Sequence, residues 1–210
     1  MAHGIGGKDA AFVRSVHGAE FLPFLYLGAK HMVTGYDHLL FLVGVIFFLY
    51  RASHIALYVT MFSLGHSITL LAGVLLGLHV NAYLVDAVIG LSIVYKALDN
   101  LGAFQTLFGF QPDSRAAVFG FGLVHGFGLA TKLQSLSPAR DGLVVNMISF
   151  NVGVELGQLI ALAAILALIL AWRRTASFAR YALYTNVALL AAGFAVTEFQ
   201  LAGYFTNGRL

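Results

Sequence analysis

Residues 52–85 read ASHIALYVTMFSLGHSITLLAGVLLGLHVNAYLV and contain no Asp, Glu, Lys or Arg. A helix needs about 20 consecutive apolar residues to cross the hydrocarbon core of a bilayer. The stretch is long enough for one such helix, which we predict at about residues 55–78, with a turn at residues 77–81. This assignment puts His66 near the middle of a membrane span.

The composition of the whole chain extends this prediction. Of the 210 residues, 60% are hydrophobic and 10% are charged, and the mean hydropathy is +0.86. A soluble domain carries about 25% charged residues, so these charges are too few to cover a water-facing surface. We therefore predict an all-α, polytopic transmembrane helix bundle with six to seven spans.

The charge pattern and the lack of cysteine exclude several classes of function. The net charge of +3 comes from cations at the ends of apolar runs, so we expect no nucleic-acid partner. Without cysteine the chain has no disulfide, thiolate metal site or iron–sulfur cluster. The sequence also has no nucleophile elbow, phosphate-binding loop or dinucleotide fingerprint.

The apolar runs predict a single transmembrane domain at residues 21–205. Residues 1–20 are polar and glycine-rich, lack the apolar core of a signal peptide, and are expected to form a tail or a surface helix. Within the domain we predict a short helix at 21–33, a loop at 102–114, and spans at 36–50, 55–78, 82–98, 116–133, 143–172 and 181–204. The span at 116–133 is rich in glycine, which lets helices approach closely in lipid.

A polar stretch at residues 30–38 interrupts the first apolar region. Pro23, Gly28 and Gly35 are unfavourable in a continuous span. We therefore favour a short interfacial or re-entrant helix that leads into a separate span. One long helix with a polar middle is the alternative.

The same stretch contains the first candidate metal site, formed by His31, Asp37 and His38. A charged side chain at mid-bilayer costs roughly 2.5–3.5 kcal/mol, so such residues pair, face a cavity or bind a ligand. On one helix the two histidines would lie about 10 Å apart, and a kink at Gly35 would bring them closer. Two imidazoles and a carboxylate suit nickel, zinc, copper or iron, and Asp37 can also orient a neighbouring imidazole. The alternative is a polar cap at a helix start.

Later spans add further candidate ligands. His66 and His125 lie inside predicted spans, although a hydrogen-bonded core histidine is the alternative for His66. Glu155 needs a cation, a proton, or Lys96 or Lys132 as a partner, because an uncompensated carboxylate in lipid is unfavourable. The supporting polar positions are Ser67, Asn151 and Gln158, and Thr69 lies near His66 in the same predicted span. The polar residues of the 143–172 span share one helical stripe with Glu155.

Other ionisable residues have a structural interpretation. Asp86 and Lys96 lie near one helix face, where an intramembrane ion pair or snorkelling ends are as reasonable as a functional role. Asn186 and Glu198 of the last span are also interpreted as structural. The histidines predicted at helix ends or in loops, outside the site, are His3, His17, His54 and His79.

At these residues the sequence resembles the HupE/UreJ family of hydrogenase and urease accessory membrane proteins. The matching segments are GAKHMVTGYDHLLFL at 28–42, FSLGHSITL at 62–70, FGFGLVHGFG at 119–128 and FNVGVELGQL at 150–159. Together they extend over most of residues 25–172.

The resemblance implies a multi-pass permease of the bacterial inner (cytoplasmic) membrane that binds or moves nickel for a metalloenzyme maturation system. Zinc, copper, cobalt or iron are the alternative metals. The resemblance carries the family's proposed metal motif onto His31, Asp37 and His38. It also matches His66, His125 and Glu155 to family positions.

Three other functions are weighed against a transporter. An intramembrane metal-dependent enzyme would use Glu155 or Asp37 as a general base, and a lateral opening to lipid would favour it. A non-transporting accessory subunit would use the histidines for a cofactor such as haem. The polar residues would otherwise only pack the helices together.

Overall fold

A computed structural model describes residues 7–136 and 140–207. In these residues the chain is helical and contains no strand. The helices are α1 (Gly7–Ser15), α2 (Phe21–Thr34), α3 (Tyr36–Ile46), α4 (Ala52–Leu76), α5 (Ala82–Asn100), α6 (Ala103–Phe108), α7 (Ser114–Gln134), α8 (Leu143–Arg173) and α9 (Ala176–Asn207). The all-α prediction is confirmed. Helix α1 lies in the segment for which the sequence predicts a tail or a surface helix, and it buries Val13. Residues 1–6 lie outside the described part.

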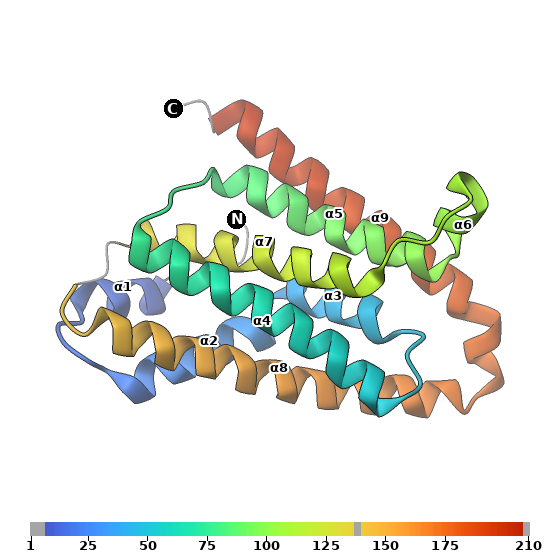
Figure 1. The fold of residues 1–210 in the computed structure, drawn as a ribbon, viewed down its shortest axis with the longest axis horizontal. Helices are drawn as coiled ribbons and strands as arrows, with labels where there is room; N and C mark the ends of the chain where they lie inside the picture. The colour runs from blue at the N-terminus through green and yellow to red at the C-terminus, as the bar shows by residue number, and fades with distance from the viewer. Residues whose placement is uncertain (1–6, 137–139, 208–210) are drawn as a thin grey trace.

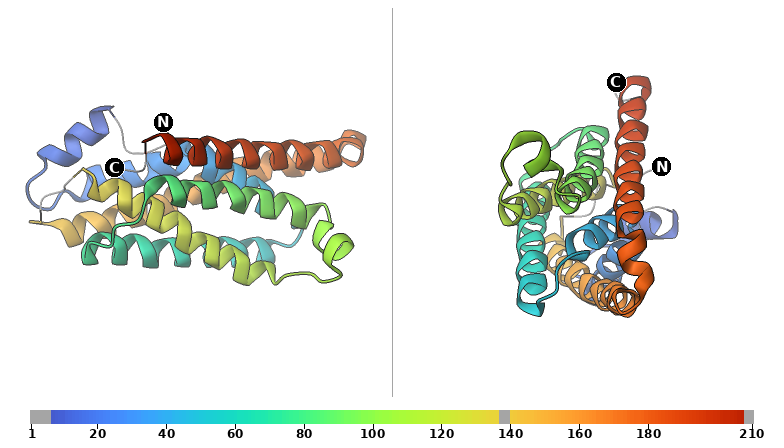
Figure 2. Two further views of the ribbon diagram at one scale, coloured as in Figure 1. Left: turned by 90° about the horizontal axis from the view of Figure 1, so that it is seen from above. Right: turned by 90° about the vertical axis from the view of Figure 1, so that its right-hand side faces the viewer.

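Long helices packed side by side form an elongated bundle (Figure 1). The closest partners are α4 with α7, α2 with α8, and α5 with α9. Figure 2 shows the bundle from above and from one end, with α9 along its outer side. The buried apolar core divides into two clusters, one around Phe24, Met147 and Phe150, the other around Phe41, Phe62 and Ile93.

Within the described residues, four helices are long and apolar enough to cross a membrane. They are Ala52–Leu76, Ser114–Gln134, Leu143–Arg173 and Ala176–Thr206. The shorter α5 carries Asp86, Lys96 and Asp99, and α2 and α3 are separate short helices. A polytopic membrane protein is therefore supported, whereas the count of six to seven spans is not confirmed.

Glycines bring the paired helices into backbone contact. A Cβ atom on Gly28 of α2 would collide with the carbonyl of Phe150 in α8. A Cβ on Gly126 of α7 would collide with the carbonyl of His66 in α4. The contact at Gly126 confirms that the glycine-rich span lets two helices approach closely.

The structure shows a broken first helix rather than one long helix. α2 ends at Thr34, Gly35 is extended, and α3 begins at Tyr36. The prediction that the following span continues to residue 50 is wrong, because α3 ends at Ile46. The guanidinium of Arg173 donates hydrogen bonds to the carbonyls that the helix leaves free there, those of Ile46, Phe47 and Leu49.

Two further boundaries differ from the prediction. The predicted loop at 102–114 contains the short helix α6. Gly102 precedes this helix and Gly109 follows it, and both glycines have the left-handed conformation. The last helix begins at Ala176 rather than at residue 181, after a turn in which Trp172 donates a hydrogen bond to Ser177. Helices α8 and α9 therefore follow each other with almost no connecting loop.

Candidate functional site

The break at Gly35 brings the first candidate ligands together. His31 lies near the end of α2, and Asp37 and His38 open α3. The rings of His31 and His38 meet edge to face with centroids 5.2 Å apart. A Cβ at Gly35 would lie 3.0 Å from Nδ1 of His38, so the tight turn favours glycine. The kink predicted from the sequence therefore does bring the two histidines together.

Two more histidines reach the same place from other helices. The ring of His66 on α4 lies 5.9 Å from that of His38, centroid to centroid. The ring of His125 on α7 lies 4.9 Å from His38. His38, His66 and His125 are almost completely buried. We call His31, His38, His66 and His125 the histidine cluster; His38 is at its centre.

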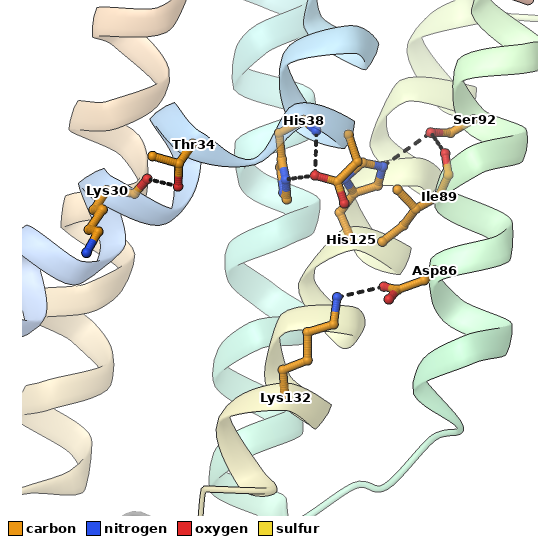
Figure 3. Close-up of polar contacts among 9 residues, drawn as sticks. Lys30, Thr34, His38, Asp86, Ile89, Ser92, His125 and Lys132 are labelled. Atoms are coloured by element: carbon orange, nitrogen blue, oxygen red, sulfur yellow. Dashed lines mark hydrogen bonds and ion pairs between the residues drawn. The ribbon is translucent and has the colours of Figure 1, made fainter. Parts of the chain in front are cut away.

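Neighbouring oxygens determine which ring nitrogens of two cluster members carry a proton. Oδ1 of Asp37 accepts from the backbone N–H of His38 at 2.9 Å and lies 3.1 Å from its Nδ1. The hydroxyl of Ser92 donates to the carbonyl of Ile89 at 2.6 Å, so its oxygen accepts from Nε2 of His125 at 3.2 Å (Figure 3). These contacts leave Nε2 of His38 and Nδ1 of His125 as lone-pair donors.

Ser92 is a site residue that sequence reasoning missed. It is fully buried in α5, a helix in which the sequence points only to Asp86 and Lys96. A single serine in an apolar helix commonly bonds to the carbonyl of the preceding turn, as Ser92 does with Ile89. The sequence therefore contains no signal that separates its second role from the first.

Several ring nitrogens in the histidine cluster are buried without a hydrogen-bond partner among the described residues. They are Nε2 of His31, Nε2 of His38, both ring nitrogens of His66, and Nδ1 of His125. Buried polar atoms in proteins are nearly always hydrogen-bonded, so unpaired atoms call for a water or an ion. Phe41 and Phe62 pack against the cluster and surround it with apolar rings.

In the described residues, no three His, Asp or Glu side chains are arranged as a ready metal site. The cluster rings contact one another edge to face. A bound metal would therefore need these rings to turn about their side-chain bonds. The cluster supplies the donors but not the final coordination geometry.

Asp86 and Lys96 do not form the ion pair considered from the sequence. Nζ of Lys132 lies 2.9 Å from Oδ1 of Asp86 (Figure 3), and Lys96 pairs with Asp99. Ten residues of α-helix separate Asp86 from Lys96 by about 15 Å along the axis, too far for contact. Both lysines are therefore paired elsewhere, so of the partners that the sequence allows for Glu155 a cation or a proton remains.

Glu155 lies apart from the histidine cluster, in a groove between α4 and α8. Its carboxylate is 3.4 Å from the hydroxyl of Ser67. Asn151 and Gln158 line the same groove, which confirms that these residues share one stripe. Thr69 instead donates to the carbonyl of Leu123 at 2.6 Å and joins α4 to α7.

The remaining polar residues lie outside the cluster. Asn186 accepts a hydrogen bond from Asn100 at 2.9 Å, and Glu198 is exposed on α9. The exposed histidines are His17, His54 and His79, as predicted. His3 lies outside the described residues.

Comparison with known proteins agrees with the architecture and with the motifs. The model of a family described as HupE / UreJ protein matches residues 7–207, nearly the whole chain. The chain belongs to the HupE/UreJ family. HupE/UreJ membership is consistent with a metal-related accessory or transport role in a membrane. No curated protein and no solved structure matches the chain.

Proposed function

We propose that this HupE/UreJ protein binds a divalent transition-metal ion at the histidine cluster and carries it across the membrane. The observation that supports this is the meeting of imidazoles from α2, α3, α4 and α7, with ring nitrogens that lack partners. Unpaired imidazole nitrogens in a bundle core are costly unless a ligand uses them. The metal is the transported substrate, and the histidine cluster is its binding site within the membrane.

The donor set favours particular metals. Neutral imidazole suits nickel, zinc, copper and iron, whereas magnesium and calcium prefer oxygen ligands. Nickel is our first choice, with zinc, copper, cobalt and iron as alternatives. His38 and His125 are the best prepared ligands, because Asp37 and Ser92 already hold the proton on the opposite nitrogen.

We infer six crossings of the bilayer. Helices α4, α7, α8 and α9 qualify by length and composition, and α5 lies between α7 and α9 with its charges paired. The sixth crossing combines α2 and α3, which meet at Gly35. A helix broken beside a ligand site is tolerated in a membrane where the freed backbone is buried in protein. We further infer a bacterial inner-membrane location and delivery to a metalloenzyme maturation system.

An intramembrane hydrolase is less well supported. It would need Asp37 or Glu155 as a general base beside a metal-bound water. Oδ1 of Asp37 accepts from both N–H groups of His38, which directs this carboxylate to the ring of His38, and Glu155 lies in the separate groove. A haem-binding subunit is also less well supported, because the edge-to-face rings leave no flat slot between them.

The direct test is metal content by elemental mass spectrometry on the full chain purified in detergent and loaded with nickel. We expect about one nickel per chain in the wild type and almost none in His38→Ala, because metal ligands are rarely replaced by water without loss of affinity. His54→Ala, which removes an exposed histidine, is the matched control and should keep its nickel. Equal nickel in His38→Ala and wild type would contradict the proposal.

A further inference from the structure

The groove between α4 and α8 is a polar feature inside a largely apolar surface. It has a volume of about 360 Å³, and its lining includes Ser63 and Ser67 from α4 and Asn151 and Glu155 from α8. On each helix these polar residues recur at spacings of three or four, so two polar stripes face each other. The groove has no role in the metal site described above.

The oxygen atoms in the groove have more capacity to accept than they have donors. The carboxylate of Glu155 has one long contact, 3.4 Å from the hydroxyl of Ser67. The side-chain oxygen of Asn151 is buried and has no hydrogen-bond partner among the described residues. A carboxylate, an amide oxygen and hydroxyls are the groups that hold a hard or hydrated cation.

Two side chains, those of Val59 and Gln158, lie between this groove and a small cavity beside the histidine cluster. A small internal cavity touches His38, and Gln158 and Val59 line both this cavity and the groove. The amide of Gln158 is held in place on both sides. Its nitrogen donates to the carbonyl of Val59 at 3.3 Å, and its oxygen accepts from the hydroxyl of Ser63 at 2.9 Å. Gln158 is the polar one of the two side chains that lie between the groove and the cavity beside His38.

We propose that the groove is a vestibule that takes a hydrated divalent cation on Glu155, and that Gln158 is the gate to the histidine cluster. This inference rests on the proposed metal-binding function. Oxygen ligands hold the ion while it keeps part of its water, and the imidazoles bind it after that water is lost. The buried Gln158 keeps the two steps apart.

The rates of metal loading and release distinguish a residue that lines a vestibule from a residue that coordinates the bound metal. A residue that lies only on the path to a site changes loading and release by the same factor and leaves the dissociation constant unchanged. A residue that coordinates the bound metal changes the dissociation constant itself, mostly through release. Measuring both rates therefore assigns Glu155 to one role or the other.

The experiment uses the full chain in lipid nanodiscs with Co²⁺ as the probe. Stopped-flow absorption follows the visible cobalt bands as Co²⁺ loads, and excess chelator then gives the release rate. We expect Glu155→Gln to slow both rates on the order of tenfold, which is the smallest effect usual for a charge that attracts an ion into a cleft. The final occupancy of the site should not change. Glu198→Gln removes the same charge from the exposed face of α9 and should load and release like the wild type.

The role of Gln158 as a gate is tested by removing a hydrogen bond that holds its side chain. Ser63→Ala deletes the hydroxyl that holds the amide oxygen, and we expect loading and release both to become faster. Gln158→Leu keeps the size of the side chain but places an apolar group between the groove and the cavity beside His38, and we expect both rates to fall. Far-ultraviolet circular dichroism confirms that each variant is folded.

The rates measured for Glu155→Gln decide whether Glu155 belongs to a vestibule. Wild-type rates in Glu155→Gln overturn the vestibule, and so does a weaker dissociation constant with faster release, which would make Glu155 a ligand of the final site. In both cases the wild type still binds Co²⁺, so the proposed function survives. Wild-type protein that shows no cobalt bands overturns the proposed function and the vestibule with it.

Discussion

Nδ1 of His38 lies 3.1 Å from Oδ1 of Asp37, the same oxygen that accepts the backbone N–H of His38. This one carboxylate therefore fixes both the start of α3 and the orientation of the central imidazole. Because the ring proton is held on Nδ1, the buried Nε2, which has no hydrogen-bond partner among the described residues, is left with a free lone pair.

Asp37→Asn keeps an oxygen acceptor but removes the negative charge that makes His38 a stronger base. We expect the affinity for nickel to fall about 10- to 100-fold, the usual effect of changing a residue that supports a metal ligand. Competition with a coloured nickel chelator measures it. Asp113→Asn, which changes an acidic cap at the exposed start of α7, is the control. Wild-type affinity in Asp37→Asn would show that the carboxylate only caps the helix.

Ser92→Ala removes the oxygen that accepts from Nε2 of His125. The imidazole is then free to place its proton on either nitrogen, and we expect nickel affinity to fall about tenfold. Ser53→Ala at the exposed start of α4 is the matched control. If Ser92→Ala binds nickel as tightly as the wild type, His125 does not coordinate through Nδ1.

The ion pair of Asp86 and Lys132 lies near the histidine cluster, since Lys132 follows His125 by two turns of α7 (Figure 3). Asp86→Asn leaves that ammonium uncompensated, and we expect weaker nickel binding by about tenfold through charge repulsion. The double variant Asp86→Asn, Lys132→Met removes both charges and should recover most of the affinity. Equilibrium dialysis with nickel measures all three proteins. A double variant that binds more weakly than Asp86→Asn alone would contradict an electrostatic origin.

Gly126→Ala places a methyl group against the carbonyl of His66 and the hydroxyl of Thr69. We expect the bundle to lose about 1–3 kcal/mol of stability, because α4 and α7 must separate to admit the methyl group. Gly120→Ala is a close control on the same helix, since its Cβ would meet open space. Denaturant unfolding in detergent, followed by circular dichroism, compares the two. Equal stabilities would show that the close contact of α4 with α7 is not needed.

The sequence predicted which residues form the site better than it predicted how they are arranged. Gly35 and the residues around it predicted a break that brings His31 close to His38, and the structure has that break. The stripe of Glu155 was also predicted, but its separation from the histidines was not. A helical stripe is a local property, whereas the neighbour that the stripe faces depends on how the helices pack.

The sequence by itself determined the helical membrane class, because too few charges remain to cover a water-facing surface. It also determined which side chains are too polar to face lipid. Only the tertiary structure decided that His66 and His125 meet His38, that Lys132 rather than Lys96 pairs with Asp86, and that Ser92 holds His125. The physical reason is that helical periodicity fixes the face of each residue along one helix, whereas backbone contacts at glycines such as Gly126 fix which helix lies opposite.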